Sequence, residues 1–571
     1  MFAAKPYITK KAKKKNEFFN SFVNRVILYD DKVIILYNSN DREIKRLNKK
    51  QLKGIESGKN LEEIKKTRLN EMSSNELHLA DGVHFHPNFG GSNGLKVTPL
   101  KNPDGTWTVE FGTKLVGQGN VVYSIFDGET LVAQGTNTLT VREPHLWDGK
   151  KDPHLYTATA TVHCGDDCDE VSATFGFRTF EISADGFVLN GRSYPLRGVC
   201  RHQDRKDKGY ALGAADHEQD AQLIQEIGAN TVRLAHYQHD DYFYDLCDKL
   251  GLIVWAEIPY ISRHMPNAND NTETQITELI NQQYNHASIV VWGISNEITM
   301  FGKHKKDMLA QHEKLNALCH ALDKTRLVTL ACFSMCTPSN KVAHITDVVA
   351  WNLYLGWYVP FFWLNDLWFW YFRKRFPHRP IGLSEYGAEG MPNLHSAKPK
   401  RGDNTEEYQC LYHEYMLKFF ERNKYLWTTN VWNMFDFAAD SRNQGGEPGM
   451  NHKGLVTYDR KLKKDAFYLY KAYWSDQPFV HLCGKRFEHR TEKKLKIKAY
   501  SNCKTLQLFV NGELVENKSG DKIFEFCVPM KDINDVSVRC GDLQDQATFI
   551  RVDKKDKNYV LKKTNTKNWQ K

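Results

Sequence analysis

Apolar and polar residues alternate in two different patterns along this chain. The change from one pattern to the other marks a domain boundary. From about residue 80 to 180, short runs of alternating apolar and polar residues are separated by turn sequences such as Asn102-Pro103-Asp104-Gly105. We expect strands over residues 94–100, 106–111, 121–126 and 155–162. Short strands separated by turns at this spacing predict an immunoglobulin-like β-sandwich.

From residue 181 to about 475, short and fully apolar runs alternate with longer amphipathic stretches. We expect eight strands, over residues 196–200, 231–234, 253–257, 289–294, 327–330, 348–353, 381–385 and 429–435. Alternating strands and helices are typical of parallel α/β proteins, and eight such units predict a (β/α)8 TIM barrel. An open doubly wound sheet is the alternative, but no glycine-rich phosphate loop follows the first strand.

The two ends of the chain differ from these parts. Residues 476–552 contain alternating runs at 494–500, 506–510 and 523–528 and predict a small C-terminal β-sandwich, and we expect the lysine-rich residues 553–571 to be disordered. Residues 1–75 form a basic segment with two apolar strands around the turn Asp30-Asp31-Lys32. This segment resembles the C-terminal end of large serine recombinases. The segment could contact DNA, but we favour the interpretation that it is a solvated basic appendage without such a role.

Two of the predicted barrel strands end on a carboxylate. The run 289–294 leads into Asn296 and Glu297, and the run 381–385 ends on Glu385, with Gly387 two residues later. The C-terminal ends of parallel barrel strands meet at one mouth, so carboxylates 88 residues apart in sequence (385 − 297) are expected to converge there. Glycoside hydrolysis usually uses a pair of carboxylates. Either glutamate alone is equally well explained by an ion pair with a lysine or arginine at the rim of the barrel.

Charged, amide and aromatic side chains follow other predicted strands as well. They are His202 after the first strand, Arg233 and His236 at the second, Tyr354 after the sixth and Trp432 within the eighth. Each of them alone is more often part of a core than of a site. Their recurrence at successive strand ends favours one shared site.

These motifs resemble glycoside hydrolase family 2, the β-galactosidase and β-glucuronidase family, over about residues 80–550. The resemblance is carried by residues 197–204, 230–237, 296–297, 384–387 and 453–460. It implies that Glu297 is the general acid/base and that Glu385 is the nucleophile. It also implies that His202, Arg233, His236 and Trp432 line the sugar subsite. Retaining enzymes of this kind hold their two carboxyl groups about 5 to 5.5 Å apart.

The chemistry requires the two carboxyl groups to be in different protonation states. Glu385 must be ionised to attack the anomeric carbon, and hydrogen bonds from Tyr354 or Arg233 are expected to stabilise its charge. Glu297 must start protonated, and the negative charge of the nucleophile is expected to raise its pKa. Asn296 is expected to bond the sugar 2-hydroxyl.

The sequence points to two different sugars. Asn451 and Lys453 resemble the Asn-x-Lys pair with which β-glucuronidases hold the sugar carboxylate, whereas residues 202–205 and 453–460 look more like bacterial β-galactosidases. We therefore favour a retaining exo-β-glycosidase that removes terminal β-galactosyl residues. A β-glucuronidase and a catalytically impaired carbohydrate-binding remnant are the alternatives.

The chain departs from the family pattern in two respects. The jelly-roll domain that the resemblance implies is recognisable only as a remnant near residues 85–91, so an N-terminally truncated chain is expected. Some β-galactosidases have a magnesium ligand two residues after a strand-three glutamate, but Glu257 is followed here by Ile258 and Pro259. We therefore predict no metal and no cofactor.

Composition restricts the partners and the compartment. The net charge of +9 comes from 78 basic and 69 acidic residues, an excess too small to predict a nucleic-acid partner. The 12 cysteines are scattered, several within apolar runs, as in a reduced cytoplasmic protein. We expect no secretory signal, because the basic N-terminus has no apolar h-region and no small-residue cleavage site. We expect no membrane segment, because the most apolar stretch, 358–372, is aromatic and is interrupted by Asn365 and Asp366. The sequence leaves a homo-oligomer open.

Overall fold

The structure is a computed structural model that describes residues 94–562, except 166, 445 and 446, and four short strands before them. These strands are β1 (Val23–Leu28), β2 (Val33–Tyr37), β3 (Lys45–Leu47) and β4 (His84–Phe85). β1 pairs antiparallel with β2, in agreement with the two strands predicted there. The rest of residues 1–75, with its recombinase resemblance, and most of the jelly-roll remnant lie outside the described residues.

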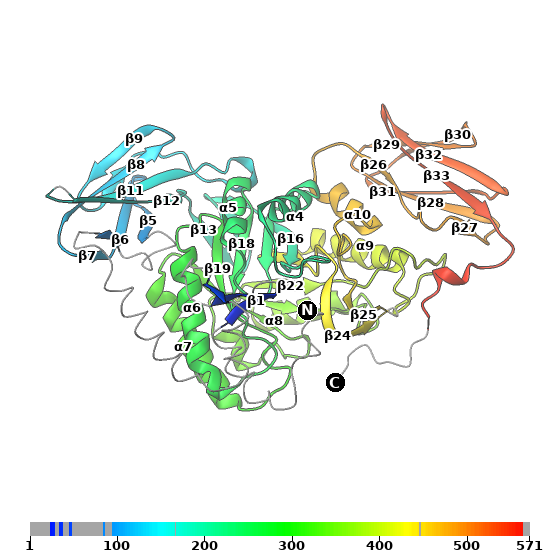
Figure 1. Ribbon diagram of the computed structural model, residues 1–571. Coiled ribbons are helices and arrows are strands. Elements are labelled where there is room, and N and C mark those ends of the chain that lie inside the picture. The colour runs from blue at the N-terminus through cyan, green and yellow to red at the C-terminus, as the bar shows by residue number, and fades with distance from the viewer. Residues whose placement is uncertain are drawn as a thin grey trace.

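Three bodies follow one another along the described chain. A β-sandwich precedes a closed barrel of eight parallel strands, a second β-sandwich follows it, and the two sandwiches flank the barrel on opposite sides (Figure 1). This arrangement confirms the predicted fold class.

The first sandwich packs two antiparallel sheets, ordered β10-β6-β5 and β12-β11-β8-β9. The strands are β5 (Leu95–Lys101), β6 (Trp107–Thr113), β8 (Asn120–Asp127), β9 (Thr130–Gly135), β10 (Leu139–Val141), β11 (Tyr156–Cys164) and β12 (Asp167–Phe175). The short strand β7 (Leu115–Val116) pairs with β4 instead. Alternate residues point inward, as the period of two requires. Trp107, Ile125, Tyr156 and Phe175 meet in the core between the sheets.

The barrel closes in strand order from β16 to β23. Its strands are β16 (Leu196–Arg201), β17 (Thr231–Leu234), β18 (Ile253–Glu257), β19 (Ile289–Asn296), β20 (Leu327–Cys332), β21 (Val349–Asn352), β22 (Ile381–Tyr386) and β23 (Thr428–Val431). They are buried on both faces, which explains why they are nearly continuous apolar runs. A Cβ at Gly198 would lie 1.9 Å from the Thr231 carbonyl oxygen, so β16 and β17 approach this closely only because residue 198 is glycine.

Helices cover the outside of the barrel. They are α4 (Ala214–Glu226), α5 (Asp241–Leu250), α6 (Asn269–Gln283), α7 (Lys305–Leu322), α8 (Leu364–Arg375) and α9 (Glu406–Arg422), with short 3-10 turns at Gly149–Lys151, Pro266–Ala268 and Lys341–His344. None of the helices in the described residues combines the length and apolar character that a membrane crossing requires.

The eighth barrel strand is shorter than predicted. β23 ends at Val431, whereas the apolar run continues to Phe435. Beyond Val431 the backbone pairs with residues 453–456 instead, because Asn433 N donates to Lys453 O (3.2 Å) and Asp436 N donates to Val456 O (2.8 Å). Trp432 therefore lies in the loop that leaves the barrel mouth rather than within a strand.

The remaining elements close the barrel and extend it. The hairpin of β13 (Phe180–Ser183), β14 (Gly186–Leu189) and β15 (Arg192–Ser193) supplies Phe187 and Leu189 to an apolar cluster with barrel residues such as Trp427. A second hairpin, β24 (Phe437–Gln444) and β25 (Glu447–Asn451), follows β23 and precedes α10 (Asp465–Trp474).

The C-terminal sandwich has sheets ordered β26-β28-β31 and β27-β33-β32-β29-β30. Its strands are β26 (Val480–Leu482), β27 (His489–Arg490), β28 (Lys494–Ser501), β29 (Thr505–Val510), β30 (Glu513–Ser519), β31 (Lys522–Pro529), β32 (Ile533–Cys540) and β33 (Leu543–Arg551).

The tail predicted to be disordered from residue 553 is ordered as far as residue 562. It contains a 3-10 turn, Lys557–Tyr559. The Tyr559 ring packs edge-on against His395 and Phe487, and this aromatic contact offsets the entropy of ordering the lysine-rich chain. Residues 563–571 lie outside the described part of the chain.

Candidate active site

The barrel mouth brings Glu297 and Glu385 close enough together for the charge of Glu385 to raise the pKa of Glu297. Glu385 is near the end of β22, and Glu297 directly follows β19. Asn352, the last residue of β21, donates to Glu297 Oε1 (3.1 Å) and to Asn296 Oδ1 (3.0 Å). Ser384, beside Glu385, donates its hydroxyl to Asn352 Oδ1 (2.7 Å) and fixes the orientation of the amide. Asn352 thus connects Glu297 to the residue next to Glu385.

Glu385 receives two strong hydrogen bonds. Arg233 Nη1 donates to its Oε1 (2.8 Å), and the Tyr354 hydroxyl donates to its Oε2 (2.6 Å). His236 Nε2 lies 3.7 Å from Oε1. The side chain is buried, so these donors replace water around a carboxylate. They fix the positions of both carboxylate oxygens.

Arg233, on the second strand of the barrel, contacts side chains from three other strands, β18, β19 and β22. Its guanidinium is fully buried and pairs with both oxygens of Glu257 (3.0 and 2.9 Å), and it donates to Asn296 Oδ1 (2.9 Å). Burial lowers the pKa of Arg233, but Glu257 and Glu385 outweigh burial and raise it above its ordinary value. The two carboxylates compensate the positive charge of the guanidinium, which burial alone would destabilise.

Glu297 has the opposite environment. Burial raises its pKa to about 8, and the negative charge of Glu385 acts in the same direction, while the hydrogen bond from Asn352 opposes them. The carboxyl group is therefore protonated at neutral pH, which suits a general acid.

The raised pKa of Glu297 predicts a pH-dependent cost in stability. Ionisation occurs near pH 4.5 in the unfolded chain and near 8 in the folded one, so the wild-type protein loses stability as pH rises between these values. Glu297→Gln removes this loss while keeping an acceptor for Asn352. We expect the variant to melt above wild type at pH 7 by roughly 3 °C, on the order of 2 kcal/mol, and to match it near pH 4.5. Melting curves at both pH values test this, and a difference that does not change with pH would contradict it.

Two hydrogen bonds to its side-chain oxygen orient the Asn296 amide. Because Arg233 and Asn352 both donate to its Oδ1, its amide nitrogen is the atom left to face a substrate. A sugar 2-hydroxyl would accept a hydrogen bond from it.

Aromatic rings form a wall beside Glu385. The His236 and Trp432 rings stack with centroids 5.1 Å apart, and His202 packs edge-on against Trp432 at 5.2 Å. His236 Nδ1 is fixed by Glu257 (2.6 Å). Burial, helped by the charges of His236 and Arg233, lowers the pKa of His202 well below its ordinary value, so His202 is a neutral ring.

Asn451, the last residue of β25, and Lys453, in the loop after it, lie near Tyr354 and Tyr358. Lys453 Nζ is fully buried, donates to the Tyr358 hydroxyl (2.9 Å) and pairs with Glu389. It lies 5.8 Å from the centroid of the Tyr354 ring, and Tyr354 is the residue that donates to Glu385. Asn451 Oδ1 accepts from Lys453 N (3.1 Å), which fixes the loop. A positive charge is thus held one aromatic ring away from Glu385.

Four residues of the site were not assigned roles from the sequence. They are Glu257, Asn352, Tyr358 and Glu389. Glu257 ends the predicted strand 253–257, and Asn352 lies one residue before the end of the predicted strand 348–353. Strand-end position is therefore a signal that could have identified them. Tyr358 and Glu389 lie in loops four residues after Tyr354 and Glu385, and no periodic pattern marks them.

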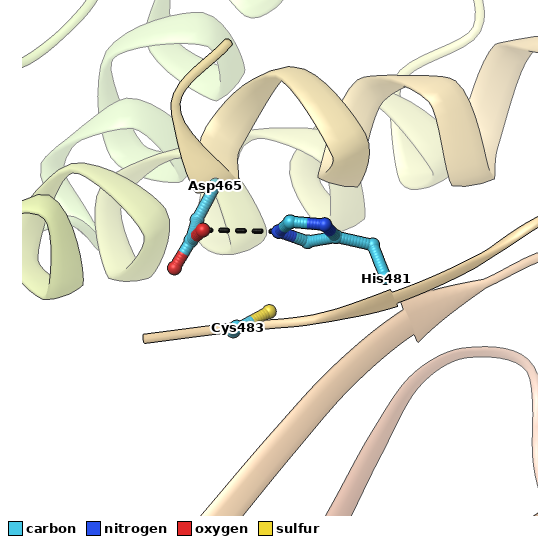
Figure 2. A group of neighbouring side chains, drawn as sticks. All are labelled: Asp465, His481 and Cys483. Atoms are coloured by element: carbon cyan, nitrogen blue, oxygen red, sulfur yellow. Dashed lines mark hydrogen bonds and ion pairs between the residues drawn. The ribbon is translucent and has the colours of Figure 1, made fainter. Parts of the chain in front are cut away.

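Elsewhere among the described residues, one group of three side chains has the spacing of metal ligands. Asp465, His481 and Cys483 place ligand atoms within 4.8 Å of one another where α10 meets β26 (Figure 2). Asp465 already contacts His481 Nε2 (3.0 Å), Gly484 N (2.6 Å) and the Arg486 guanidinium (3.3 Å). Burial raises the pKa of the Cys483 thiol, and the adjacent guanidinium disfavours a cation. We interpret the group as a hydrogen-bonded joint between the barrel and the C-terminal sandwich.

The chain is similar to known proteins over most of its described length. The family model "Glycosyl hydrolases family 2, TIM barrel domain" matches residues 180–477, and "Glycosyl hydrolases family 2" matches residues 94–178. A β-glucuronidase of Bacteroides fragilis is 37% identical over 418 residues, 70% of this chain and 59% of its own. A putative β-glucuronidase of Formosa agariphila is 32% identical over 558 residues, 89% of this chain and 64% of its own.

Among solved structures, an FMN-binding β-glucuronidase from Facaelibacterium prausnitzii L2-6 is 41% identical, with a TM-score of 0.81 over 84% of this chain and 77% of that chain. The chain spans less than two thirds of the length of either curated relative named above.

Proposed function

Because this chain belongs to glycosyl hydrolases family 2, we propose that it is a retaining exo-β-glycosidase whose preferred substrates are terminal β-glucuronides. The sequence favoured β-galactosides, but the relatives described above are named β-glucuronidases, which supports the alternative. The observation that carries the proposal is the buried ammonium of Lys453, 5.8 Å from the ring centroid of Tyr354, whose hydroxyl donates to Glu385.

In the first step Glu385 attacks the anomeric carbon. The bond from this carbon to the leaving oxygen breaks as the bond to the Glu385 carboxylate forms, and the proton of Glu297 passes to the leaving oxygen. Arg233 and Tyr354 hold the attacking carboxylate, and Asn296 donates to the 2-hydroxyl.

In the second step the ionised Glu297 removes a proton from water, which attacks the glycosyl ester and frees Glu385. Two displacements at one carbon return the sugar with its original β configuration. Burial is the largest cause of the raised pKa of Glu297, and the charge of Glu385 is the second. The ester intermediate removes the second cause and so lowers the pKa of Glu297, which helps the same residue to serve as acid and then as base.

Lys453 and Asn451 are proposed to recognise the substituent at C5 of the sugar. A glucuronide carries a carboxylate there, and an ammonium in a buried site binds it by a charge-assisted hydrogen bond. A galactoside carries a neutral hydroxymethyl group there, which offers the ammonium no negative charge beyond that of Glu389. Glu389 and Tyr358 hold the Lys453 side chain in place.

Hydrolysis of nitrophenyl β-glucuronide and nitrophenyl β-galactoside by the purified chain tests the proposal. We expect kcat/KM for the glucuronide to exceed that for the galactoside by at least about 100-fold, the discrimination typical of a charged contact. The reverse order would favour the β-galactosidase alternative. Binding of either sugar by a folded protein without turnover would favour the carbohydrate-binding remnant.

A further inference from the structure

The outward face of α8 is apolar, although the helix lies on the outside of the barrel. Its inward face is buried through Phe369 and Phe372. On the opposite face Leu367, Trp370 and Tyr371 are 49%, 57% and 45% exposed. A surface helix normally presents polar residues outward, and a helix that is apolar all round is normally buried. The outward face of α8 is therefore expected to have a partner.

The exposed apolar side chains form one row along the helix. Residues three, four or seven positions apart lie on one side of an α-helix, and this spacing relates Leu367, Trp370, Tyr371 and Lys374. The row begins one turn earlier with Trp363, which is 56% exposed. We call Trp363, Leu367, Trp370 and Tyr371 the apolar stripe. Single exposed apolar residues are common, but a contiguous stripe of them marks an interaction surface.

Three cations lie at the end of the apolar stripe. Arg373, Lys374 and Arg375 form the last turn of α8, and all three are exposed. The Lys374 ammonium lies 5.0 Å from the centroid of the Trp370 ring, on the line of the stripe itself. At about 100° per residue, Arg373 and Arg375 project to the two sides of that line. Tryptophan, tyrosine and leucine bordered by lysine and arginine are typical of helices that lie in the interface of a membrane.

The end of α9 adds to the positive charge around α8. The two helix ends are neighbours, because Arg422 Nη2 lies 3.0 Å from Asp366 Oδ1 and the Arg373 guanidinium lies 4.0 Å from the centroid of the Tyr425 ring. Residues 418–424 contain one exposed acid and three exposed cations: Glu421, Lys418, Arg422 and Lys424. Cations therefore outnumber carboxylates on both elements, and this surface attracts polyanions.

The charge favours a lipid surface over a second copy of the chain. Asp366 is the one acidic residue of α8, and it already binds Arg422 and accepts from the Tyr415 hydroxyl. Two copies that paired through α8 would bring six cations of the two helices into one interface with no unpaired carboxylate from either helix, and juxtaposed like charges oppose association. Anionic headgroups balance the cations, and the boundary between headgroups and acyl chains accepts the apolar stripe.

We propose that α8 docks this chain onto anionic phospholipid bilayers, with the apolar stripe among the headgroups and Arg373, Lys374 and Arg375 paired with lipid phosphates. The helix lies on the bilayer and does not cross it, because its 12 residues span about 18 Å, less than the hydrocarbon core of about 30 Å. Docking is independent of hydrolysis and goes beyond the proposed function.

Flotation of the full chain with lipid vesicles tests the docking. Vesicles of equal parts phosphatidylcholine and phosphatidylserine supply the anionic surface, and vesicles of phosphatidylcholine alone supply the neutral one. We expect binding to the neutral vesicles to be at least about 100-fold weaker. The variant Leu367→Ser/Trp370→Ser should weaken binding to the anionic vesicles by about tenfold or more, because it removes apolar contact. Neutralising the cations with Arg373→Gln/Lys374→Gln/Arg375→Gln should weaken it by about 100-fold.

Leu514→Ser/Val515→Ser is the matched control. Both residues are 49% exposed, as Leu367 is, but they lie on β30 of the C-terminal sandwich, so the control should bind like wild type. Melting curves check that each variant is folded.

Three results would overturn the proposal. The first is a wild-type chain that does not float with anionic vesicles. The second is binding that Leu367→Ser/Trp370→Ser leaves unchanged, or that the control weakens equally, since this would show only the general attraction of a basic chain to anionic lipid. The third is a wild-type dimer that Leu367→Ser/Trp370→Ser converts to monomers without loss of vesicle binding, which would assign the apolar stripe to a second copy of the chain.

Discussion

Replacing Glu385 by alanine is expected to lower kcat for a β-glucuronide by at least about 10⁴-fold, because it removes the atom that forms the covalent bond. The fold should survive, since Arg233 keeps both of its contacts to Glu257 and its contact to Asn296. Kinetics with a nitrophenyl substrate measure the loss, and circular dichroism checks the fold.

Azide distinguishes a nucleophile from a general acid at this position. In Glu385→Ala, azide enters from the face that the carboxylate vacated, so turnover is rescued and the α-glucuronosyl azide forms. In the matched variant Glu297→Ala, Glu385 still forms the ester, and azide displaces it to give the β-azide. Proton NMR of the products separates the two outcomes, and a β-azide from Glu385→Ala would refute the assigned roles.

Replacing Lys453 by methionine is expected to have the second largest effect and to act on one sugar only. Loss of the ammonium should lower kcat/KM for the glucuronide by about 10²- to 10³-fold, the usual cost of removing one partner of a buried charged contact. The galactoside has no carboxylate to lose, so its kcat/KM should change little. Parallel kinetics on the two nitrophenyl substrates measure this difference.

A general structural failure would also lower activity, because Lys453→Met leaves the buried Glu389 carboxylate without its lysine. The double variant Lys453→Met/Glu389→Gln removes both charges and controls for this cost. If the glucuronide preference is lost in both variants while galactoside turnover persists, Lys453 recognises the sugar. An equal fall for both substrates would show that Lys453 supports the pocket without selecting the sugar.

The apolar pattern of the sequence predicted the barrel strands that carry Glu297 and Glu385. β19 and β22 are uninterrupted apolar runs that stop on polar residues, so the positions of Glu297 and Glu385 at the barrel mouth followed from strand length and the parallel barrel rule. The eighth strand was predicted four residues too long, because the apolar residues beyond Val431 pair with residues 453–456, a contact distant in sequence.

Other features of the site depend on strand register and loop paths, which the periodicity of apolar residues in the sequence does not reveal. The register between β21 and β22 shifts next to Asn352, and that between β19 and β20 shifts before Asn296. Such irregularities redirect side chains, and they place the Asn352 amide between Asn296 and Glu297. Lys453 was predicted from a motif, but its partners Tyr358 and Glu389 come from two other loops, whose paths the pattern of apolar residues does not specify.

Covalent labelling of Glu385 tests the central claim most directly. A 2-deoxy-2-fluoro-β-glucuronosyl fluoride has a good leaving group but a slow second step, so the glycosyl ester should accumulate. We expect peptide mapping by mass spectrometry to find one sugar per chain, on the peptide that contains Glu385, and no label after Glu385→Ala. Under the same conditions the 2-fluoro-galactosyl analogue should label the chain far more slowly. Labelling of another residue, or faster labelling by the galactosyl compound, would contradict a β-glucuronidase in which Glu385 is the nucleophile.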